Sequence, residues 1–318
     1  MGQAGIARGA TGTAWSPWAP LPLAMPPDSE VLAEILGGGQ AFRWRLEPGG
    51  EWSGAWSRNR VRLRHGPEGA LEWSAPMALA AASGPALGDY LDSGRDPREL
   101  ADNLPWRSDP HLARCIASFP GLRILRQPLG ETLLCFLCSA TKRIVQIKQM
   151  AALLAEAHGS RIGSEGEPAH ALPTWQELAE VSEADLRACR LGFRARHVHL
   201  TARFLAANPG WLEETGGAPY PEARQRLCQL PGVGEKVADC VLLFGAGRLE
   251  AFPVDVWILK AMSRRYGLEG WKPAQVAQFG RSHFGALAGL AQQYLFAWER
   301  MWEKAESGNR KSEKKQIG

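Results

Sequence analysis

The sequence predicts an α+β protein in which a small N-terminal antiparallel β-sheet domain precedes a mostly α-helical domain. Between residues 40 and 75, stretches such as "EWSGAWS" and "RVRLRH" alternate apolar with polar residues and are separated by turn-forming sequences, which is typical of half-buried antiparallel strands. From about residue 76 onward, apolar residues recur three and four positions apart, as in "ETLLCFLCSATKRIVQIKQMAALLAEAHG". This spacing is typical of amphipathic helices.

The domain boundaries follow from these two patterns. We expect a β-rich domain over residues 23–105 and a helical domain over residues 106–303. Residues 1–22 are rich in Ala, Gly and Pro, and residues 304–318 are mostly charged or polar, so both ends are expected to be disordered. Four tryptophans of the strand region are expected to form the core of the sheet domain rather than a binding cage: Trp44, Trp52, Trp56 and Trp73.

Composition and charge narrow the class of protein. The chain has 318 residues and is 45% apolar, which is enough for a substantial core. It contains no apolar run of about eighteen residues, so we expect no membrane contact. A net charge of +4 permits nucleic-acid binding without requiring it.

Six cysteines in a chain of this length do not indicate a disulfide framework. Cys135 and Cys138 form a CxxC pair, but the other four cysteines supply no second pair at zinc or iron–sulfur spacing. We expect the pair to be small buried residues of a helix. The sequence therefore predicts a reduced, intracellular protein with no metal and no cofactor.

The stretch "LPGVGEKVADC" over residues 230–240 carries the first chemical signal. Gly232 and Gly234 predict a tight turn between two helices, with the hairpin spanning about residues 223–247. Backbone N–H groups at the start of the second helix have no partner within the helix and form an anion site, which suits one DNA phosphate. A plain connection between two helices explains the turn equally well.

Lys236 lies in the first turn of the second predicted helix, where the helix dipole disfavours a cation. A neutral amine is favoured there and is a competent nucleophile, although a solvated lysine or a phosphate contact also fits the spacing. Asp255 follows in "FPVDVW", just before another helical run. Aspartate is a preferred N-cap, yet this carboxylate could also accept the proton of the amine or stabilise positive charge developing on a sugar.

Together, "LPGVGEKVADC" and "FPVDVW" resemble the helix-hairpin-helix DNA glycosylases, and within them the 8-oxoguanine DNA glycosylase/AP lyases. Four more stretches, "GGGQAFRWR", "GLRILRQPLGETLLCFLCS", "LGFRARHV" and "AQQYLF", occur in the family order over roughly residues 23–300. The resemblance implies a helix-hairpin-helix glycosylase domain and a base-excision repair enzyme that flips 8-oxoguanine out of double-stranded DNA. It also implies that Lys236 attacks the anomeric carbon, forms a Schiff base and nicks the strand by β-elimination, with Asp255 assisting.

The resemblance also assigns the damaged-base pocket. Gly39 matches the glycine whose carbonyl accepts the N7–H that only the oxidised base carries. Phe296 and Cys240 match the two residues that sandwich the base, and Gln292 matches the residue that bonds its Watson–Crick edge. Without the resemblance, Phe296 and Cys240 would be interpreted as core residues. The resemblance further implies Pro253 and Phe244 in the pocket, and Gly232, Gly234 and Val237 at a DNA phosphate.

The sequence departs from eukaryotic relatives where they read the base opposite the lesion. Those relatives carry a run of asparagines and then an arginine, whereas this chain has Thr141 and Gln146. Arg194 remains, beside Phe193 in place of a tyrosine wedge. Because arginine is a strong bidentate reader and Thr and Gln make fewer or neutral contacts, we expect looser discrimination of the opposite base. Trp257 replaces a phosphate-contacting histidine, which removes one charged contact.

Three other functions fit parts of the sequence. A glycosylase for alkylated bases that activates water lacks the motif lysine, so Lys236 argues against it. A glycosylase that releases base without nicking the strand is a second alternative. A non-catalytic helix-hairpin-helix module explains the glycine turn but gives no role to Lys236 with Asp255. We expect a monomer that works with DNA, in bacterial cytoplasm and nucleoid or in a eukaryotic nucleus.

Overall fold

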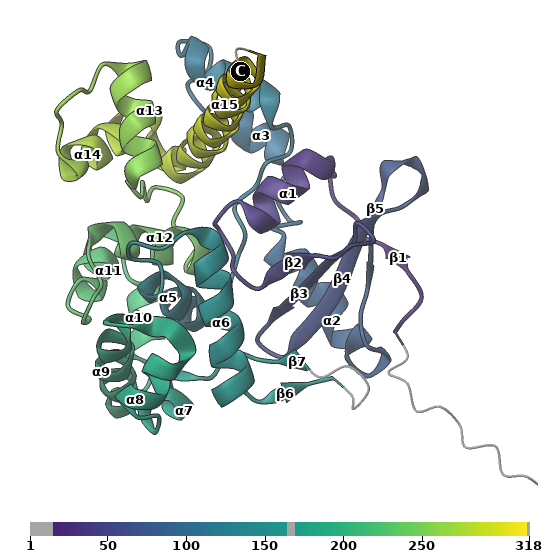
Figure 1. Cartoon of the computed structure of the whole chain (residues 1–318), viewed down its shortest axis with the longest axis vertical. Coiled ribbons are helices and arrows are strands. Elements are labelled where there is room, and N and C mark those ends of the chain that lie inside the picture. The colour runs from purple at the N-terminus through teal and green to yellow at the C-terminus, as the bar shows by residue number, and fades with distance from the viewer. Residues whose placement is uncertain (1–14, 164–168, 317–318) are drawn as a thin grey trace, which may run out of the picture.

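A five-stranded antiparallel sheet lies on one side of the molecule, and helices make up the rest (Figure 1). The computed structural model describes residues 15–163 and 169–316. The strand order is β1-β5-β4-β3-β2, and the predicted fold class is confirmed. The strands of this sheet are β1 (Ala19–Pro20), β2 (Trp44–Leu46), β3 (Trp52–Trp56), β4 (Asn59–His65) and β5 (Leu71–Ser74).

Aromatic side chains fill the inner face of the sheet, as the alternating pattern predicts. Burial alternates along β3, with Trp52 and Trp56 both buried. Trp44 stacks on Trp56 with ring centroids 6.0 Å apart, and its indole N–H donates to the Tyr90 hydroxyl at 3.1 Å. Gly54 is required because an added Cβ would lie 2.4 Å from the Trp44 ring. Trp73 is only partly buried but packs against the same core.

The expectation of a disordered segment over residues 1–22 is wrong for the part that the structure describes. Residues 1–14 lie outside the described residues. Ala19 and Pro20 pair with β5, the Leu21 side chain is buried, and the Ser16 N–H donates to the Ala75 carbonyl at 2.7 Å. Arg62 lies over the Trp15 ring at 3.9 Å. Composition missed this segment because two large rings and one leucine are enough to fix a short strand.

Helices make up most of the chain after β5, and one helix precedes the sheet's second strand. A two-stranded hairpin, β6 (Arg161–Ile162) and β7 (Ala169–His170), follows α6. The longer helices are α1 (Ser29–Gly37), α2 (Met77–Tyr90), α4 (Pro110–Ser118), α5 (Leu129–Leu137), α6 (Ile144–His158), α9 (Arg194–Ala207), α11 (Tyr220–Leu227), α12 (Glu235–Gly245), α13 (Val256–Tyr266), α14 (Pro273–Phe284) and α15 (Ala288–Gln316). The shorter helices are α3 (Pro97–Asp102), α7 (Trp175–Ala179), α8 (Glu183–Leu186) and α10 (Trp211–Gly217).

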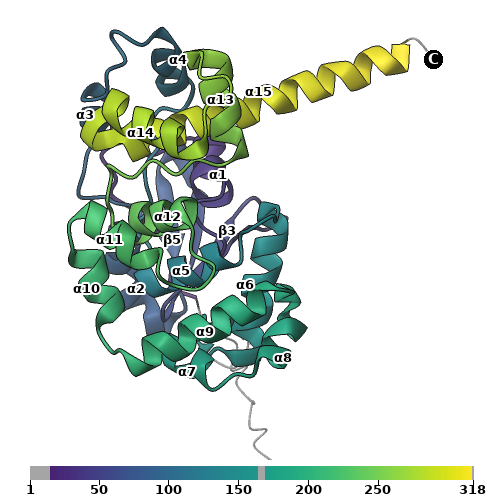
Figure 2. The ribbon, with the colours of Figure 1, turned by 90° about the vertical axis from the view of Figure 1, so that its left-hand side faces the viewer.

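Helix α15 is longer than the sequence predicts. It continues to Gln316, so the expectation of a disordered tail over residues 304–318 is wrong up to that residue, and residues 317–318 lie outside the described residues. The first part of α15 packs on α13 and α4, and its last part runs out beyond the body of the molecule (Figure 2).

Helices α5 and α12 lie side by side at the centre of the helical part (Figure 1). All side chains of α5 from Thr132 to Leu137 are buried, and the Phe136 ring stacks on Phe244 of α12 at 5.6 Å. Cys135 and Cys138 are buried, as predicted, and burial raises the pKa of both thiols.

The sheet and the helices are joined by buried hydrogen bonds. The Gln40 side-chain amide donates to the Arg123 carbonyl at 3.0 Å and accepts from the Leu125 N–H at 3.0 Å. The Gln127 amide donates to the Gln40 carbonyl at 2.7 Å, while the Gln127 N–H donates to the Phe244 carbonyl at 2.8 Å. Residues 123–127 therefore connect the segment that follows α1 to α12.

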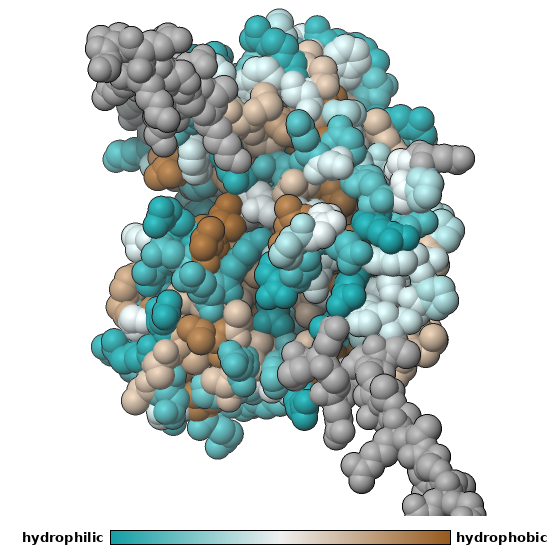
Figure 3. All heavy atoms as spheres, turned by 45° about the vertical axis from the view of Figure 1, so that its right-hand side comes forward, coloured by the Kyte–Doolittle hydropathy of each residue, from teal (hydrophilic) through white to brown (hydrophobic). Residues whose placement is uncertain are grey.

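On the face drawn in Figure 3 hydrophilic side chains predominate, and the apolar ones form small separate groups. Among the described residues, none of the helices is both long and apolar enough to span a bilayer.

Candidate active site

The glycine turn between α11 and α12 has the conformation that the sequence predicts. Gly232 has φ +81°, and an added Cβ would lie 2.5 Å from Nδ1 of His197. Gly234 is the N-cap of α12. Because glycine has no side chain, no N-cap side chain accepts a hydrogen bond from the first N–H groups of the helix. A Cβ at Gly234 would meet nothing within 4 Å. The space in front of this helix end is therefore open to an anion such as a phosphate.

A buried ion network fixes the direction of α12. Asp239, one turn after Lys236, accepts from the Tyr220 hydroxyl at 2.7 Å and from Nε of Arg224 at 3.1 Å. Arg281 of α14 lies 4.0 Å from the same carboxylate. Burial raises the pKa of Asp239, while the hydrogen bond from Tyr220 and the two arginines oppose that rise. The first turn of α12, with Lys236, is thus held against both α11 and α14.

Lys236 lies between an aromatic ring and two polar side chains. Its Nζ is 5.1 Å from the ring centroid of Phe136, within the range of a cation–π contact. Burial raises the pKa of the Cys240 thiol to about 11, and the interaction with Lys236 opposes this rise. The Asp255 carboxylate also interacts electrostatically with Lys236. The structure therefore brings Lys236, Cys240 and Asp255 together, as the resemblance implies.

Asp255 caps α13. One carboxylate oxygen, Oδ1, accepts from the N–H groups of Trp257 at 3.0 Å and Ile258 at 2.9 Å. Burial raises the pKa of Asp255, and the hydrogen bond from Ile258, the charge of Lys236 and the hydrogen bond from Trp257 counteract it. The cap orients the carboxylate by its backbone bonds.

Gly39 and Phe296 come together although they lie at opposite ends of the chain. Gly39 has φ +120°, which side chains rarely adopt. An added Cβ there would lie 3.2 Å from Cδ1 of Ile144 and 3.9 Å from Cζ of Phe296. Phe42, three residues after Gly39, packs edge-on against Phe136 at 5.4 Å. Phe136 therefore contacts both Lys236 and Phe42, which belongs to the segment that carries Gly39.

The other predicted pocket residues are more deeply placed. Gln292 is buried, and its Oε1 accepts from the side chain of Gln293 at 2.7 Å. Pro253 is buried in the segment that leads to Asp255, and Phe244 is buried beneath Phe136. Val237 is buried on α12, next to the open helix end. Their predicted contacts with a base or a phosphate stay predictions.

The predicted readers of the opposite base lie on two neighbouring segments. Phe193 is 54% exposed, as a wedge requires. Arg194 is buried, and its guanidinium donates to the carbonyls of Leu191 and Ala140 and to Oγ1 of Thr141. Thr141 has φ +55°, so Arg194 stabilises a rarely adopted backbone conformation.

Gln146 is also engaged within the chain. Its Oε1 accepts from the Arg143 N–H at 3.0 Å and so caps the start of α6. Arg194 would have to release an internal hydrogen bond to read a base, whereas Gln146 could use its Nε2 donors and keep its cap. Their role in reading the opposite base stays a prediction.

Three residues of the site carry no signal in the sequence: Phe136, Ile144 and Arg300. In the sequence, Phe136 and Ile144 resemble ordinary core residues, and Arg300 resembles an ordinary charged surface residue. They reach the site from distant segments, so only the packing of α5, α6 and α15 reveals them. Arg300 donates to the Gly38 carbonyl, next to Gly39, at 2.6 Å.

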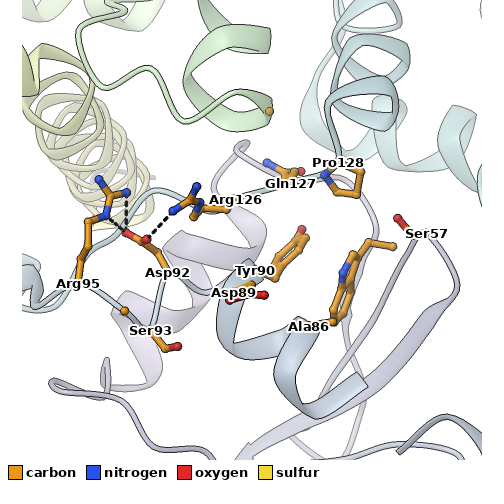
Figure 4. Close-up of a pocket in the computed structure, with 13 residues that line it drawn as sticks. Ser57, Ala86, Asp89, Tyr90, Asp92, Ser93, Arg95, Arg126, Gln127 and Pro128 are labelled. Atoms are coloured by element: carbon orange, nitrogen blue, oxygen red, sulfur yellow. Dashed lines mark hydrogen bonds and ion pairs between the residues drawn. The ribbon is translucent and has the colours of Figure 1, made fainter. Parts of the chain in front are cut away.

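A cavity of about 720 Å³ lies elsewhere, between α2 and the chain that precedes α5 (Figure 4). It touches Gly245, at the far end of α12 from Lys236, and a helix of this length spans roughly 15 Å. Three of its charged side chains pair within the wall, because Arg95 lies 2.7 Å and Arg126 3.7 Å from the Asp92 carboxylate. Among the described residues, no group of three or more His, Cys, Asp or Glu side chains could hold a metal ion.

The sequence matches two families of known proteins. Residues 23–133 match the family "8-oxoguanine DNA glycosylase, N-terminal domain", and residues 134–283 match "HhH-GPD superfamily base excision DNA repair protein". The two matches meet at residue 134, inside α5, whereas the sequence pattern places the domain boundary at residue 106; that boundary stays a prediction.

Curated and solved relatives agree with the family matches. The chain is 33% identical to N-glycosylase/DNA lyase OGG1 of Arabidopsis thaliana over 82% of its own length and 75% of that protein. It is 30% identical to a probable N-glycosylase/DNA lyase of Methanothermobacter thermautotrophicus over 62% of its length and 70% of that protein. A crystal structure of the 8-oxoguanine glycosylase/lyase of Clostridium acetobutylicum, in complex with DNA containing cytosine opposite 8-oxoguanine, superposes with a TM-score of 0.79. That structure is 32% identical and covers 86% of this chain and 92% of its own.

Proposed function

Because the chain belongs to the 8-oxoguanine DNA glycosylases of the HhH-GPD superfamily, we propose that it removes 8-oxoguanine from double-stranded DNA and then nicks the strand. The observation that carries the proposal is the meeting of Lys236, Cys240 and Asp255 at the start of α12. The open end of this helix, at Gly234, receives a DNA phosphate and brings the sugar of the lesion to Lys236.

The chemistry proceeds in two stages. The neutral amine of Lys236 attacks C1′ of the sugar, and the bond from C1′ to the base breaks with its electron pair leaving on the base. The amine loses a proton, the base takes one up, and opening of the sugar ring gives a Schiff base. Loss of a C2′ proton then expels the 3′ phosphate. Asp255 stabilises the positive charge that develops on the sugar, with its carboxylate oriented by the start of α13.

Base selection rests on Gly39. Its carbonyl accepts the N7–H of 8-oxoguanine, and undamaged guanine presents a lone pair at the same place and is repelled. Phe296 supports one face of the base and Cys240 the other. Burial keeps the Cys240 thiol protonated at neutral pH, since its pKa is raised to about 11. The thiol therefore acts as a neutral contact surface rather than as a competing nucleophile.

Borohydride trapping tests this function. A duplex with one 8-oxoguanine should give a covalent adduct with the wild-type protein, and Lys236→Gln should give none, because the amine that forms the Schiff base is gone. Lys148→Gln is a matched control: this lysine also lies near an aromatic ring, Trp52 at 5.9 Å, and donates to the Trp44 carbonyl at 2.7 Å. Release of free base by Lys236→Gln at the wild-type rate would instead favour a water-activating mechanism through Asp255.

We also propose that the enzyme discriminates weakly between bases opposite the lesion. Arg194 is bound to Ala140 and Thr141, so it cannot read cytosine without losing an internal bond. Gln146 caps α6 through Oε1 and offers cytosine only neutral amide donors, which discriminate less than an arginine. Single-turnover excision opposite each of the four bases should therefore give similar rates. Gln146→Arg adds a bidentate donor and should raise the preference for cytosine by about tenfold or more. A strong cytosine preference in the wild-type protein would contradict the proposal.

The site residues all come from one chain, which supports a monomeric enzyme. Its substrate sets its location: the protein works where the cell keeps its DNA, which we propose is the nucleoid or, in a eukaryote, the nucleus.

A further inference from the structure

The end of α1 concentrates negative charge beside the proposed base pocket. Gly38 is the C-cap of this helix, and its N–H donates to the Glu34 carbonyl at 2.8 Å. The Glu34 carboxylate folds over the same turn, because a Cβ added to Gly38 would lie 2.2 Å from Oε1 of Glu34. Carbonyl groups at a helix C-terminus carry partial negative charge, so a carboxylate there is unfavourable on its own.

Arg300 of α15 neutralises this charge. Its Nη1 donates to the Gly38 carbonyl at 2.6 Å and to Oε1 of Glu34 at 2.8 Å. Both side chains are largely buried, at 15% exposure for Arg300 and 16% for Glu34. A shielded, charge-assisted hydrogen bond of this kind is stronger and more directional than one at the surface.

Arg300 also contacts the other wall of the pocket. It lies one helical turn after Phe296, and its guanidinium is 5.3 Å from the centroid of the Phe296 ring. The Gly38 carbonyl belongs to the same rigid peptide group as the N–H of Gly39. A bond to that carbonyl therefore fixes the peptide plane from which Gly39 begins. One side chain thus touches the ring that stacks on the base and the peptide group next to the carbonyl that selects it.

We propose that Arg300 is a positioning residue that sets the separation between Gly39 and Phe296 and so controls recognition of the oxidised base. The inference rests on the proposed function, because it assigns the Gly39 carbonyl to the N7–H of the base.

The need for such a tie follows from the local sequence. Gly37, Gly38 and Gly39 form a run without side chains, and glycine has the largest conformational freedom of all residues. Gly39 keeps φ +120° in the structure, and no described side chain other than Arg300 donates to this run. Without the tie, the Gly39 carbonyl loses the fixed direction on which discrimination of a single N–H depends.

The two activities of the enzyme provide the test. Release of 8-oxoguanine needs the base pocket, whereas cleavage of DNA that already contains an abasic site needs Lys236 and no base. We therefore measure both single-turnover rates, on an 8-oxoguanine duplex and on an abasic duplex of the same sequence, for the full chain and its variants.

Arg300→Met keeps the aliphatic stem against Phe296 and removes every donor. We expect it to slow 8-oxoguanine release by roughly ten- to a hundredfold, since a small misplacement of reacting groups has effects of this size, and to leave abasic cleavage at the wild-type rate. Arg300→Lys, which keeps one charged donor, should recover part of the lost rate. Arg95→Met is the matched control, because it breaks a comparable arginine–carboxylate pair, with Asp92 at 2.7 Å, away from the pocket.

Two results would overturn the inference. Equal slowing of base release and abasic cleavage by Arg300→Met would show general damage to the fold, and unchanged base release would show that Gly39 needs no tie. A wild-type protein that cleaves abasic DNA but releases no 8-oxoguanine would overturn the proposed function together with the inference, which separates that failure from the other two.

Discussion

At the scale of single residues, the carboxyl group of Asp255 caps a helix and also has the chemical role that we propose. Its Oδ1 holds the first turn of α13 through two backbone N–H groups, and its charge faces Lys236. The sequence predicts Asp255 as an N-cap, and the resemblance adds a chemical role that a cap does not exclude. The structure shows the cap directly, and the chemical role stays a proposal.

The raised pKa of Asp255 predicts a pH dependence. Burial raises the pKa of Asp255 above that of a free aspartate, and the proposed mechanism needs the ionised form. Below its raised pKa the carboxyl is protonated, so base release should decline with acidification at a higher pH than an unperturbed aspartate would give. The measurement is the single-turnover rate of 8-oxoguanine release against pH, on a protein shown by circular dichroism to stay folded. Asp255→Asn should be slow at every pH and lack this acidic decline; an Asn variant with the wild-type profile would assign the decline to another group.

Single residues also show how far a sequence can be interpreted. Lys236 could be singled out because a lysine is unusual in the first turn of a helix. Asp255 is an ordinary N-cap residue, so only the family resemblance gave it a chemical role. Phe136 could not, because a phenylalanine in an apolar helix predicts only burial. Arg300 could not either, since its partner Gly38 lies at the other end of the chain and no local pattern connects them.

At the scale of elements, the hairpin of α11 and α12 depends on one glycine. Gly232 has φ +81° and no room for a side chain beside His197, whereas Gly234 has an ordinary φ of −96° and open space in front of it. Glycine is therefore needed at the two positions for different structural reasons. The first is required by the turn itself, and the second leaves room for a ligand.

Gly232→Ala should weaken every activity that needs DNA. The added Cβ meets His197 and the alanine disfavours the positive φ, so the open end of α12 moves. We expect weaker binding of 8-oxoguanine, abasic and undamaged duplexes by the same factor, measured by fluorescence anisotropy at one fixed salt concentration. Gly247→Ala, at a positive-φ glycine with nothing near its Cβ, is the control for backbone strain alone. A loss confined to the 8-oxoguanine duplex would place Gly232 in the base pocket instead.

Elements near the ends of the chain were the least predictable. Strand β1 has two residues, too few for an alternating pattern, and it exists because β5 supplies a partner. The last turns of α15 have a composition typical of a solvated tail, yet the helix continues from the packed part before them. Strands β3 and β4 were predictable because each alternates buried and less buried residues over several positions.

At the scale of the whole molecule, buried hydrogen bonds make the sheet and the helices one unit. Gln40 bonds both the Arg123 carbonyl and the Leu125 N–H, and Arg123 donates in turn to the carbonyls of Met25, Gly121 and Leu91. Few of these partners are close in sequence, so no sequence pattern predicts them.

This junction predicts a single cooperative thermal transition. Gln40→Ala leaves the buried Leu125 N–H and Arg123 carbonyl without partners, and each such group costs about 1–3 kcal/mol in the free energy of unfolding. The variant should therefore unfold at a lower temperature, still in one step, by differential scanning calorimetry. Gln149→Ala changes an exposed glutamine of α6 and should leave the transition in place. Two separate transitions in the wild-type protein would show that the sheet and the helices unfold independently.

The pairing of β1 with β5 has a practical consequence for solubility. The family match begins at residue 23, and a chain trimmed to that point would lack Trp15, Ala19 and Pro20. The outer backbone groups of β5 would then be free to pair with another copy, as exposed edge strands do in aggregating proteins. Such a truncation should precipitate at concentrations at which the full chain stays dispersed, although every residue assigned to the pocket is still present.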